Sequence, residues 1–161
     1  MGLQAPQEIV AIVGRKFSYE ILVRANPKLA WEIFSNWKRW HTFANVYGRL
    51  EWVKGEPWTV GSRLSIEILQ PIRVVVDHVI THCDPGERVG WIDHAMGVAI
   101  DQWVMFESKD ERGTLVKTAG EIVGADLVLP NGIPLEKFVN EFTRHWYEAY
   151  AEVCNQLAPV A

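Results

Sequence analysis

The chain has 161 residues, of which 48% are hydrophobic and 22% are charged. This length and composition are typical of one globular domain with a sizeable core, and they exclude a disordered chain. The formal net charge is −4 and no basic run exceeds Lys38-Arg39, so binding of nucleic acid through its phosphates is not expected. No apolar run reaches membrane-spanning length, and the first residues lack the basic segment of a signal peptide. We therefore expect a soluble, cytoplasmic protein without a membrane span, whose Cys83 and Cys154 are reduced.

The first elements expected are a strand and two short helices. Apolar and polar residues alternate over 17–24, which is the periodicity of a strand. Asn26 followed by proline is typical of a helix start, and this helix should run to about Ser35. A second helical piece is expected over 37–43. Three of the chain's eight tryptophans fall within the stretch 31–43, and we interpret them mainly as anchors that hold it to the rest of the fold.

Six further strands are expected after this segment, joined by short turns. They cover residues 46–54, 62–69, 72–83, 88–94, 98–109 and 114–123. Consecutive strands joined in this way indicate an antiparallel meander. In the first of the six, strict alternation places Tyr47 on the face opposite to Leu50 and Trp52.

The last element expected is a helix from Pro134 to about Leu157. Its apolar residues fall in an arc of roughly 120°. They are Leu135, Phe138, Val139, Phe142, Trp146, Ala149, Tyr150, Val153 and Leu157. A face this apolar must be covered, and the sheet is the surface available, so we expect the helix to pack against the sheet.

This order of elements, with three local motifs, resembles the START-related helix-grip (SRPBCC) superfamily, which includes polyketide cyclase/dehydrase-like proteins and the birch-pollen-allergen fold. The motifs are NPKLAWEIFSNWKRW at 26–40, DPGERVGW at 84–91 and GTLVKTAGEIVG at 113–124. The resemblance implies an α+β fold of β-α-α-β6-α order. In it a curved seven-stranded antiparallel sheet wraps around the C-terminal helix, and two short helices close one end. We expect one such domain over 15–161 and an N-terminal tail over 1–14.

The resemblance also implies a cavity between the sheet and the long helix. A pocket of this class has a volume of about 300 Å³ or more, and an unfilled space of that size would forfeit several kcal/mol at roughly 24 cal/mol per Å³. We therefore expect a small apolar or aromatic molecule to bind there, without a cofactor or a metal. The alternative is that the tryptophans fill the interior. The ligand-binding residues expected are Trp40, His41, Phe43, Ile80, Trp91, Gln102, Val104, Thr118, Phe138, Phe142 and Trp146.

A histidine and an aspartate are the candidates for catalysis. If Pro85-Gly86 forms a two-residue loop, His78 lies opposite Asp93 across the hairpin, and the carboxylate would orient the imidazole. A one-residue bulge in the turn would set His78 opposite His94 instead. His82 is expected on the same strand face as His78 and His94 on the other, so no metal site is expected. A cyclase/dehydratase-like enzyme that uses His78 and Asp93 is the alternative function.

The sixth strand offers a third hypothesis. Gln102 and Phe106 share one face of it, and Trp103 and Met105 share the other. The resemblance implies that the face ending in Phe106 points toward the helix, which leaves Trp103 and Met105 as an apolar patch on the outer face. Such a patch suggests a homodimer contact or a protein-interaction module. A shift of one residue would exchange the two faces.

Overall fold

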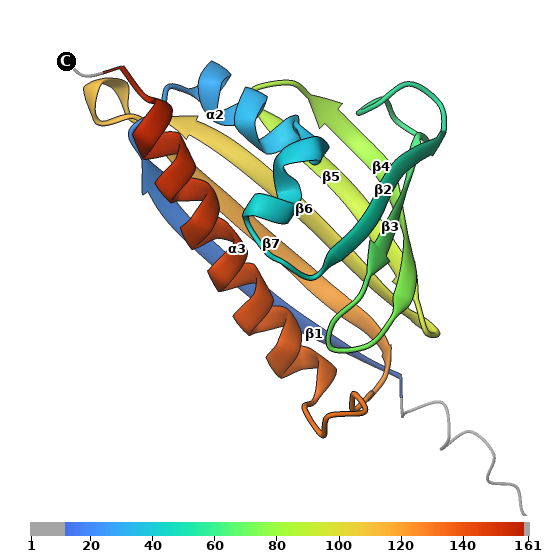
Figure 1. Cartoon of the computed structure of the whole chain (residues 1–161). Helices are drawn as coiled ribbons and strands as arrows, with labels where there is room; N and C mark the ends of the chain where they lie inside the picture. The colour runs from blue at the N-terminus through green and yellow to red at the C-terminus, as the bar shows by residue number, and fades with distance from the viewer. Residues whose placement is uncertain (1–11, 160–161) are drawn as a thin grey trace, which may run out of the picture.

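A computed structural model describes residues 12–159, which form a curved sheet, a long helix across it and a short helical segment at one end (Figure 1). Most of the expected tail lies outside this range, but residues 12–14 belong to the first strand and not to a tail. The elements are β1 (Ile12–Val23), α2 (Pro27–Ser35), the 3-10 helix η1 (Trp37–Thr42), β2 (Tyr47–Lys54), β3 (Arg63–Ile68), β4 (Val74–Asp84), β5 (Arg88–Ala95), β6 (Val98–Ser108), η2 (Asp110–Arg112), β7 (Thr114–Ala125) and α3 (Leu135–Leu157). The predicted α+β helix-grip architecture is confirmed.

The seven strands form one antiparallel sheet in the order β1-β7-β6-β5-β4-β3-β2. Strands β2 to β7 are each bonded to their neighbours in sequence, as the short turns predict. Strand β1 is different because it pairs with β7 along its whole length, from Ile12 opposite Ala125 to Val23 opposite Thr114. The chain therefore leaves β1 beside the turn between β6 and β7, which is where α2 begins.

The sequence around α2 explains where the helix begins. The Asn26 side chain accepts a hydrogen bond from the Leu29 backbone N–H at 2.9 Å, and Pro27 takes the first helical position. Both residues suit a helix start, because the first turn leaves N–H groups without helical partners and proline has no N–H. The start of this helix predicted from Asn26-Pro27 is therefore confirmed.

Two indole groups close the other end of α2. Trp40 Nε1 donates to the Phe34 carbonyl oxygen at 2.8 Å, and Trp58 Nε1 donates to the Ser35 carbonyl oxygen at 2.8 Å. Carbonyl groups in the last turn of a helix have no helical partner, so these bonds act in place of a capping residue. They also join α2 to η1 and to the loop between β2 and β3.

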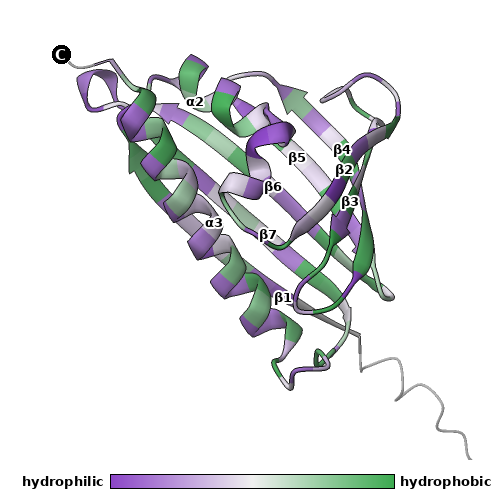
Figure 2. Ribbon diagram, in the orientation of Figure 1, coloured by the Kyte–Doolittle hydropathy of each residue, from purple (hydrophilic) through white to green (hydrophobic). Residues whose placement is uncertain are grey.

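Helix α3 packs on the sheet with a wider and rotated face compared with the predicted arc. In Figure 2 apolar and polar residues alternate along its ribbon, as in an amphipathic helix. Its buried residues are Leu135, Val139, Thr143, Trp146, Tyr147, Tyr150, Ala151 and Cys154. Leu157 was predicted to lie inside but is 50% exposed. The rotation follows from β1, which also contacts the helix: Tyr19 of that strand packs against Tyr147 with ring centroids 6.4 Å apart.

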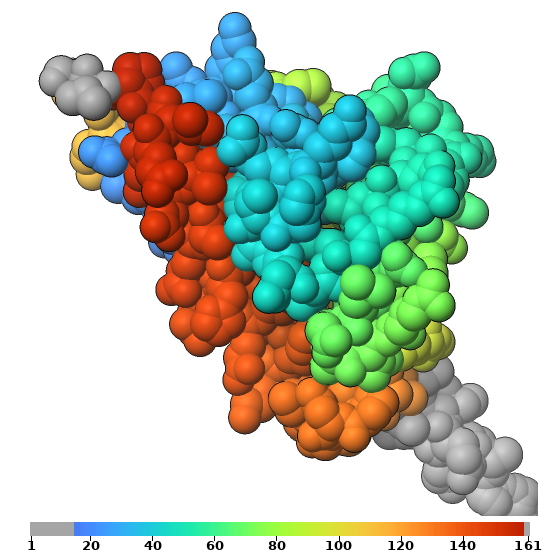
Figure 3. Space-filling model, in the orientation of Figure 1, coloured from blue at the N-terminus to red at the C-terminus, as the bar shows by residue number. Residues whose placement is uncertain are grey.

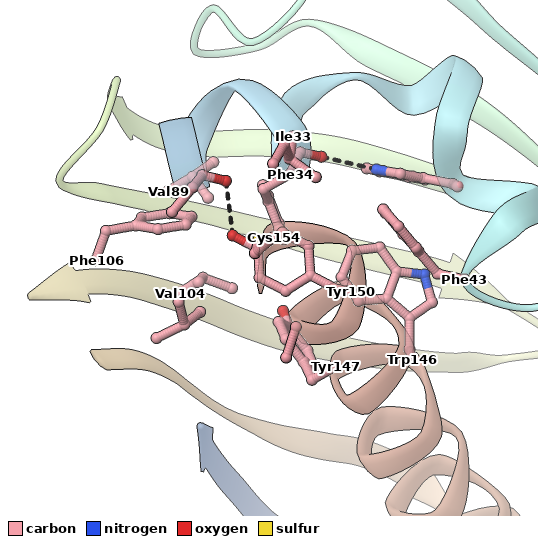
Figure 4. Close-up of a cluster of buried hydrophobic side chains, with 14 of the residues drawn as sticks. Ile33, Phe34, Phe43, Val89, Val104, Phe106, Trp146, Tyr147, Tyr150 and Cys154 are labelled. Carbon is pink, nitrogen blue, oxygen red and sulfur yellow. Dashed lines mark hydrogen bonds between the residues drawn. The ribbon is translucent and has the colours of Figure 1, made fainter. Parts of the chain in front are cut away.

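The interior has two ends with different contents. At the first, which we call the packed end, aromatic side chains from α2, η1 and the last turns of α3 surround Phe34 (Figure 4). At the second, the cavity end, the sheet and the first turns of α3 enclose a space lined by aliphatic and aromatic side chains. Phe34 and Trp146 of the packed end also form part of its wall. Within residues 12–159 no helix is long and apolar enough to cross a membrane.

Candidate functional site

A cavity of about 180 Å³ lies between the sheet and the N-terminal half of α3. A second space of about 110 Å³ adjoins it toward the loops at the far end of the sheet. The two share the side chains of Ile68, Val76, Asp93, Ile100, Phe138 and Val139. The sequence led us to expect one pocket of about 300 Å³ or more. The interior has two adjoining smaller ones, and Trp40, Trp91 and Trp146 form part of the wall of the larger.

Most of the predicted site residues line the larger cavity. They are Trp40, His78, Trp91, Asp93, Gln102, Phe138, Phe142 and Trp146. They come from η1, β4, β5, β6 and α3, so the cavity gathers residues from widely separated parts of the chain. Whether they bind a ligand stays a prediction.

Five predicted residues do not line this cavity. Ile80 and Val104 are fully buried in the packed core, because they lie farther along the strands toward α2. Thr118 is also buried. Its hydroxyl accepts a hydrogen bond from Gln102 Nε2 and donates one to the Trp103 backbone carbonyl, both at 2.9 Å. Thr118 therefore holds the Gln102 side chain in place. His41 and Phe43 instead line a groove on the outer surface.

That groove follows the line where the η1 segment meets α3, on the face shown in Figure 3. Phe138 and Phe142 line both the groove and the cavity, and their rings stack with centroids 5.7 Å apart. These two rings therefore form the partition between the cavity and the outside. Of the two predicted residues that line the groove, His41 is exposed, whereas Phe43 is buried against Trp146 with ring centroids 4.9 Å apart.

Sequence reasoning missed nine residues of the cavity wall, namely Phe34, Tyr47, Ile66, Ile68, Val76, Ile100, Val139, Thr143 and Tyr147. Tyr47 was predicted to lie on the face opposite to Leu50 and Trp52. It faces inward because the pairing of β2 with β3 shifts between Tyr47 and Leu50, which places both on the inner side. Gly48 was the available signal: a side chain there would overlap the Glu67 carboxylate, which accepts the Arg49 N–H at 2.9 Å within the irregular stretch.

The predicted pairing of His78 with Asp93 is present, although the turn is not the one assumed. Asp84 pairs with Arg88, so the loop has three residues, and this alone would set His78 opposite His94. A bulge at Thr81 then shifts the register by one residue and restores the pairing of His78 with Asp93. The longer loop and the bulge each shift the strand register by one residue, in opposite directions, so the two shifts cancel.

The same bulge separates His78 from His82, which were predicted to share a face. His82 turns toward solvent and its Nε2 lies 2.8 Å from Asp84 Oδ2, as an exposed pair. His94 is exposed on the outer side, opposite Asp77. In the described part of the chain, no three His, Cys, Asp or Glu side chains converge to hold a metal ion.

His78 lies in an aromatic enclosure at the boundary between the packed end and the cavity end. Its ring centroid is 5.0 Å from that of Trp91 and 6.0 Å from that of Trp40. Its Nδ1 is 2.7 Å from Asp93 Oδ1, and Trp91 Nε1 donates to the second carboxylate oxygen at 3.1 Å. Its Nε2 is buried and has no hydrogen-bond partner among residues 12–159. A buried polar atom left in this state costs about 1–3 kcal/mol.

Two tyrosines on the wall are held in the protonated form. Removal of the hydroxyl from water raises the pKa of both Tyr47 and Tyr147 far above the ordinary value, because burial disfavours the phenolate. Neither is therefore a base at neutral pH. Both are neutral groups that can donate or accept a hydrogen bond.

The outer face of β6 carries Trp103 and Met105, as the resemblance implied. Both side chains are only partly exposed, and the Arg88 guanidinium lies over the Trp103 ring at 5.6 Å from its centroid. A charged group thus covers part of the expected apolar patch. The homodimer contact and the interaction module stay predictions.

Comparison with solved structures identifies the same architecture in proteins of low sequence identity. Ara h 8.0201 matches with a TM-score of 0.72 and 14% identity, over 88% of this chain and 98% of that one. A START superfamily protein from Mycobacterium smegmatis matches with a TM-score of 0.66 and 14% identity, over 91% and 99%. A protein from Rhizobium leguminosarum matches with a TM-score of 0.69 and 13% identity, over 90% and 97%. At this level of identity the likeness shows the fold, which is the helix-grip fold predicted from the sequence.

Scans against protein-family profiles and against curated proteins find no match.

Proposed function

Because the chain has the helix-grip fold, we propose that it binds a small hydrophobic or aromatic molecule in the cavity between the sheet and α3. The observation that carries this proposal is the cavity itself, about 180 Å³ within the grip. At about 24 cal/mol per Å³, a space of that volume would cost roughly 4 kcal/mol if nothing filled it. That is a large share of the 5–15 kcal/mol by which a domain is typically stable.

The composition of the wall supports an apolar ligand. Aliphatic and aromatic side chains make up most of it, with polar groups confined to a few positions, including His78, Asp93 and Gln102. Ligand sites in proteins generally have this composition, in which apolar area supplies affinity and a few polar groups fix orientation. A cytoplasmic location and the absence of a cofactor remain predictions from the sequence.

Native mass spectrometry of freshly purified protein tests the proposal first, and we expect a bound compound that organic extraction removes. A thermal-shift screen with small aromatic and lipid-like compounds is the second test. A compound at a hundred times its Kd should raise Tm by roughly 5–10 °C. Ile100→Phe, which places a ring in the cavity, is the matched control and should abolish the shift. No bound compound and no shift across the screen would contradict the proposal.

A second candidate is a cyclase/dehydratase-like enzyme, and the unpartnered Nε2 of His78 favours it. A buried imidazole held by a carboxylate is a common general base, and it could remove a proton next to a ketone and return it to a leaving hydroxyl. The test is incubation with a linear poly-β-ketone thioester analogue, with mass spectrometry for the loss of one water.

His78→Gln should abolish that turnover and retain affinity for the analogue, while the exposed His82→Gln should leave both unchanged. Turnover that does not exceed the rate without protein would rule out the enzymatic function and leave the binding function standing.

A further inference from the structure

The polar atoms of the cavity point to a more specific ligand. We infer that it carries a hydroxyl group, which donates a hydrogen bond to Nε2 of His78 while the apolar remainder lies against Ile100 and Val139. This inference rests on the proposed binding function. It adds the chemistry by which the cavity would distinguish one hydrophobic molecule from another.

Asp93 sets the role of each nitrogen of the His78 ring. A carboxylate only accepts hydrogen bonds, so Nδ1, 2.7 Å from Asp93 Oδ1, carries the proton and donates. With that proton on Nδ1, the Nε2 atom of an imidazole presents a lone pair. Trp91 Nε1 donates to the second oxygen of Asp93 at 3.1 Å, which fixes the orientation of the carboxylate. The ring is therefore held with an acceptor as its remaining polar atom.

That acceptor has no partner in the protein. The His78 side chain is 4% exposed, and no group among residues 12–159 bonds its Nε2. Trp52 Nε1 and two nitrogens of Arg15 are also buried without partners, but neither residue lines the cavity. His78 is thus the point at which a donor on the ligand gains most, since buried polar groups are almost always paired.

The remainder of the site favours an apolar body. The adjoining space continues the cavity between Ile72, Met96 and Leu129, and Asp93 is the one charged residue on its described wall. An engineered cavity of about 150 Å³ in another protein binds benzene, so the larger cavity here suits one ring or two fused rings. A flat hydroxylated aromatic molecule, with its hydroxyl at the His78 end, fits these features.

Three probes of matched size test the inference: 2-naphthol, 2-methylnaphthalene and 2-methoxynaphthalene. The first donates a hydrogen bond, the second neither donates nor accepts, and the third only accepts. Titration calorimetry should give a Kd for 2-naphthol about tenfold below those of both others. Apolar burial alone would favour the methyl compound, so this order cannot come from hydrophobicity. Binding of all three with equal Kd would overturn the inference but keep the proposed function, whereas binding of none would contradict the function itself.

Asp93→Asn tests the positioning role of the carboxylate. The Trp91 N–H still needs an acceptor, so the amide oxygen should face Trp91 and the amide NH₂ should face His78 Nδ1. Nδ1 must then accept, and the proton moves to Nε2. The preference for 2-naphthol over 2-methoxynaphthalene should fall from about tenfold to about equal. A preserved preference would overturn the inference, and the exposed His82→Leu serves as the control that should keep it.

Nitrogen NMR of the wild-type protein gives a direct reading that needs no substitution. In the free protein the spectrum should show a proton on His78 Nδ1 and none on Nε2. Addition of 2-naphthol should shift the Nε2 resonance in the direction of an accepted hydrogen bond, and addition of 2-methylnaphthalene should not. An Nε2 resonance that responds equally to both probes would overturn the inference.

Discussion

At the packed end of the interior, the Phe34 ring lies 5.5–6.5 Å from eight other aromatic rings, whereas at the cavity end Ile100 faces a space of about 180 Å³. Both regions are built on the same sheet face. Strand β6 runs from one to the other: Phe106 and Val104 are fully packed, Gln102 lies at the boundary, and Ile100 lines the cavity.

The difference between the two ends shows how one helix-grip fold combines a stable core with an interior cavity. The side chains that close the packed end are large aromatic rings carried by α2, η1 and α3, and they leave little free volume. Toward Ile100 the sheet presents smaller aliphatic groups, and free space remains between them and α3. A filled core and a cavity, which the sequence left as alternatives, are therefore both present, and they adjoin at Phe34 and Trp146.

Phe34→Ala should give the largest loss of stability. The ring is 2% exposed at the centre of the aromatic cluster, so its removal leaves a void that rigid neighbours cannot close. We expect the free energy of unfolding in urea to fall by about 3–5 kcal/mol. Phe138→Ala at the cavity end is the control, because this ring is only partly buried and its removal should cost clearly less. Equal losses at the two positions would remove the distinction between the ends.

The thiol of Cys154, at the packed end, should make stability fall in alkaline solution. Burial raises its pKa from 9.0 to about 11. Below pH 9 both the folded and the unfolded thiol keep the proton, and the group adds no pH dependence. Between about pH 9 and 11 the unfolded thiol ionises first, so the free energy of unfolding falls by up to about 1.4 kcal/mol per pH unit.

Urea unfolding of the wild type and of Cys154→Ala at about pH 8, 9 and 10 checks this expectation. The variant should start lower but decline less steeply. The buried tyrosines ionise at still higher pH and act in the same direction, because burial also raises the pKa of Tyr150. Parallel declines in the two proteins would show that Cys154 is not the cause.

Two substitutions on the inner face of β6 compare the ends within a single strand. Val104→Phe forces extra volume into a fully buried site and should cost about 1–3 kcal/mol. Ile100→Phe places the same ring in the cavity and should cost less than about 1 kcal/mol, while the affinity for 2-methylnaphthalene falls at least tenfold. Urea unfolding and calorimetry measure the two effects. An Ile100→Phe variant as unstable as Val104→Phe would contradict the assignment of free volume to this end.

The fold could be predicted because its signals are local. The Asn26 cap, the short turns between strands and the apolar period of α3 each act within a few residues, and each is read from neighbouring positions. Cavity volume is different, because it is a small difference between the space enclosed by the backbone and the space filled by side chains. No periodicity reports that difference, so both the size and the division of the cavity had to come from the structure.

Register explains the remaining differences. The pairing of His78 with Asp93 was predicted from a two-residue loop, and it is present because a longer loop and a bulge at Thr81 compensate. Tyr47 was assigned to the wrong face because a second irregularity falls inside β2, where strict alternation fails. Tyr147 was missed because it lies outside the predicted apolar arc, on the flank of the helix that packs against Tyr19 of β1.

Tyr150→Phe should give a small effect, and it tests what the packed end gains from polar contacts. The hydroxyl donates to the Ala30 carbonyl at 2.6 Å and ties α3 to α2. Its loss keeps the ring and most of the packing, so we expect a decrease of about 1 kcal/mol in the free energy of unfolding. Tyr19→Phe, whose ring also packs on α3, has no side-chain hydrogen bond within residues 12–159 and should change stability by less than about 0.5 kcal/mol. If both substitutions were neutral, the packed end would owe its stability to ring packing alone, and the bond to Ala30 would only orient the tyrosine.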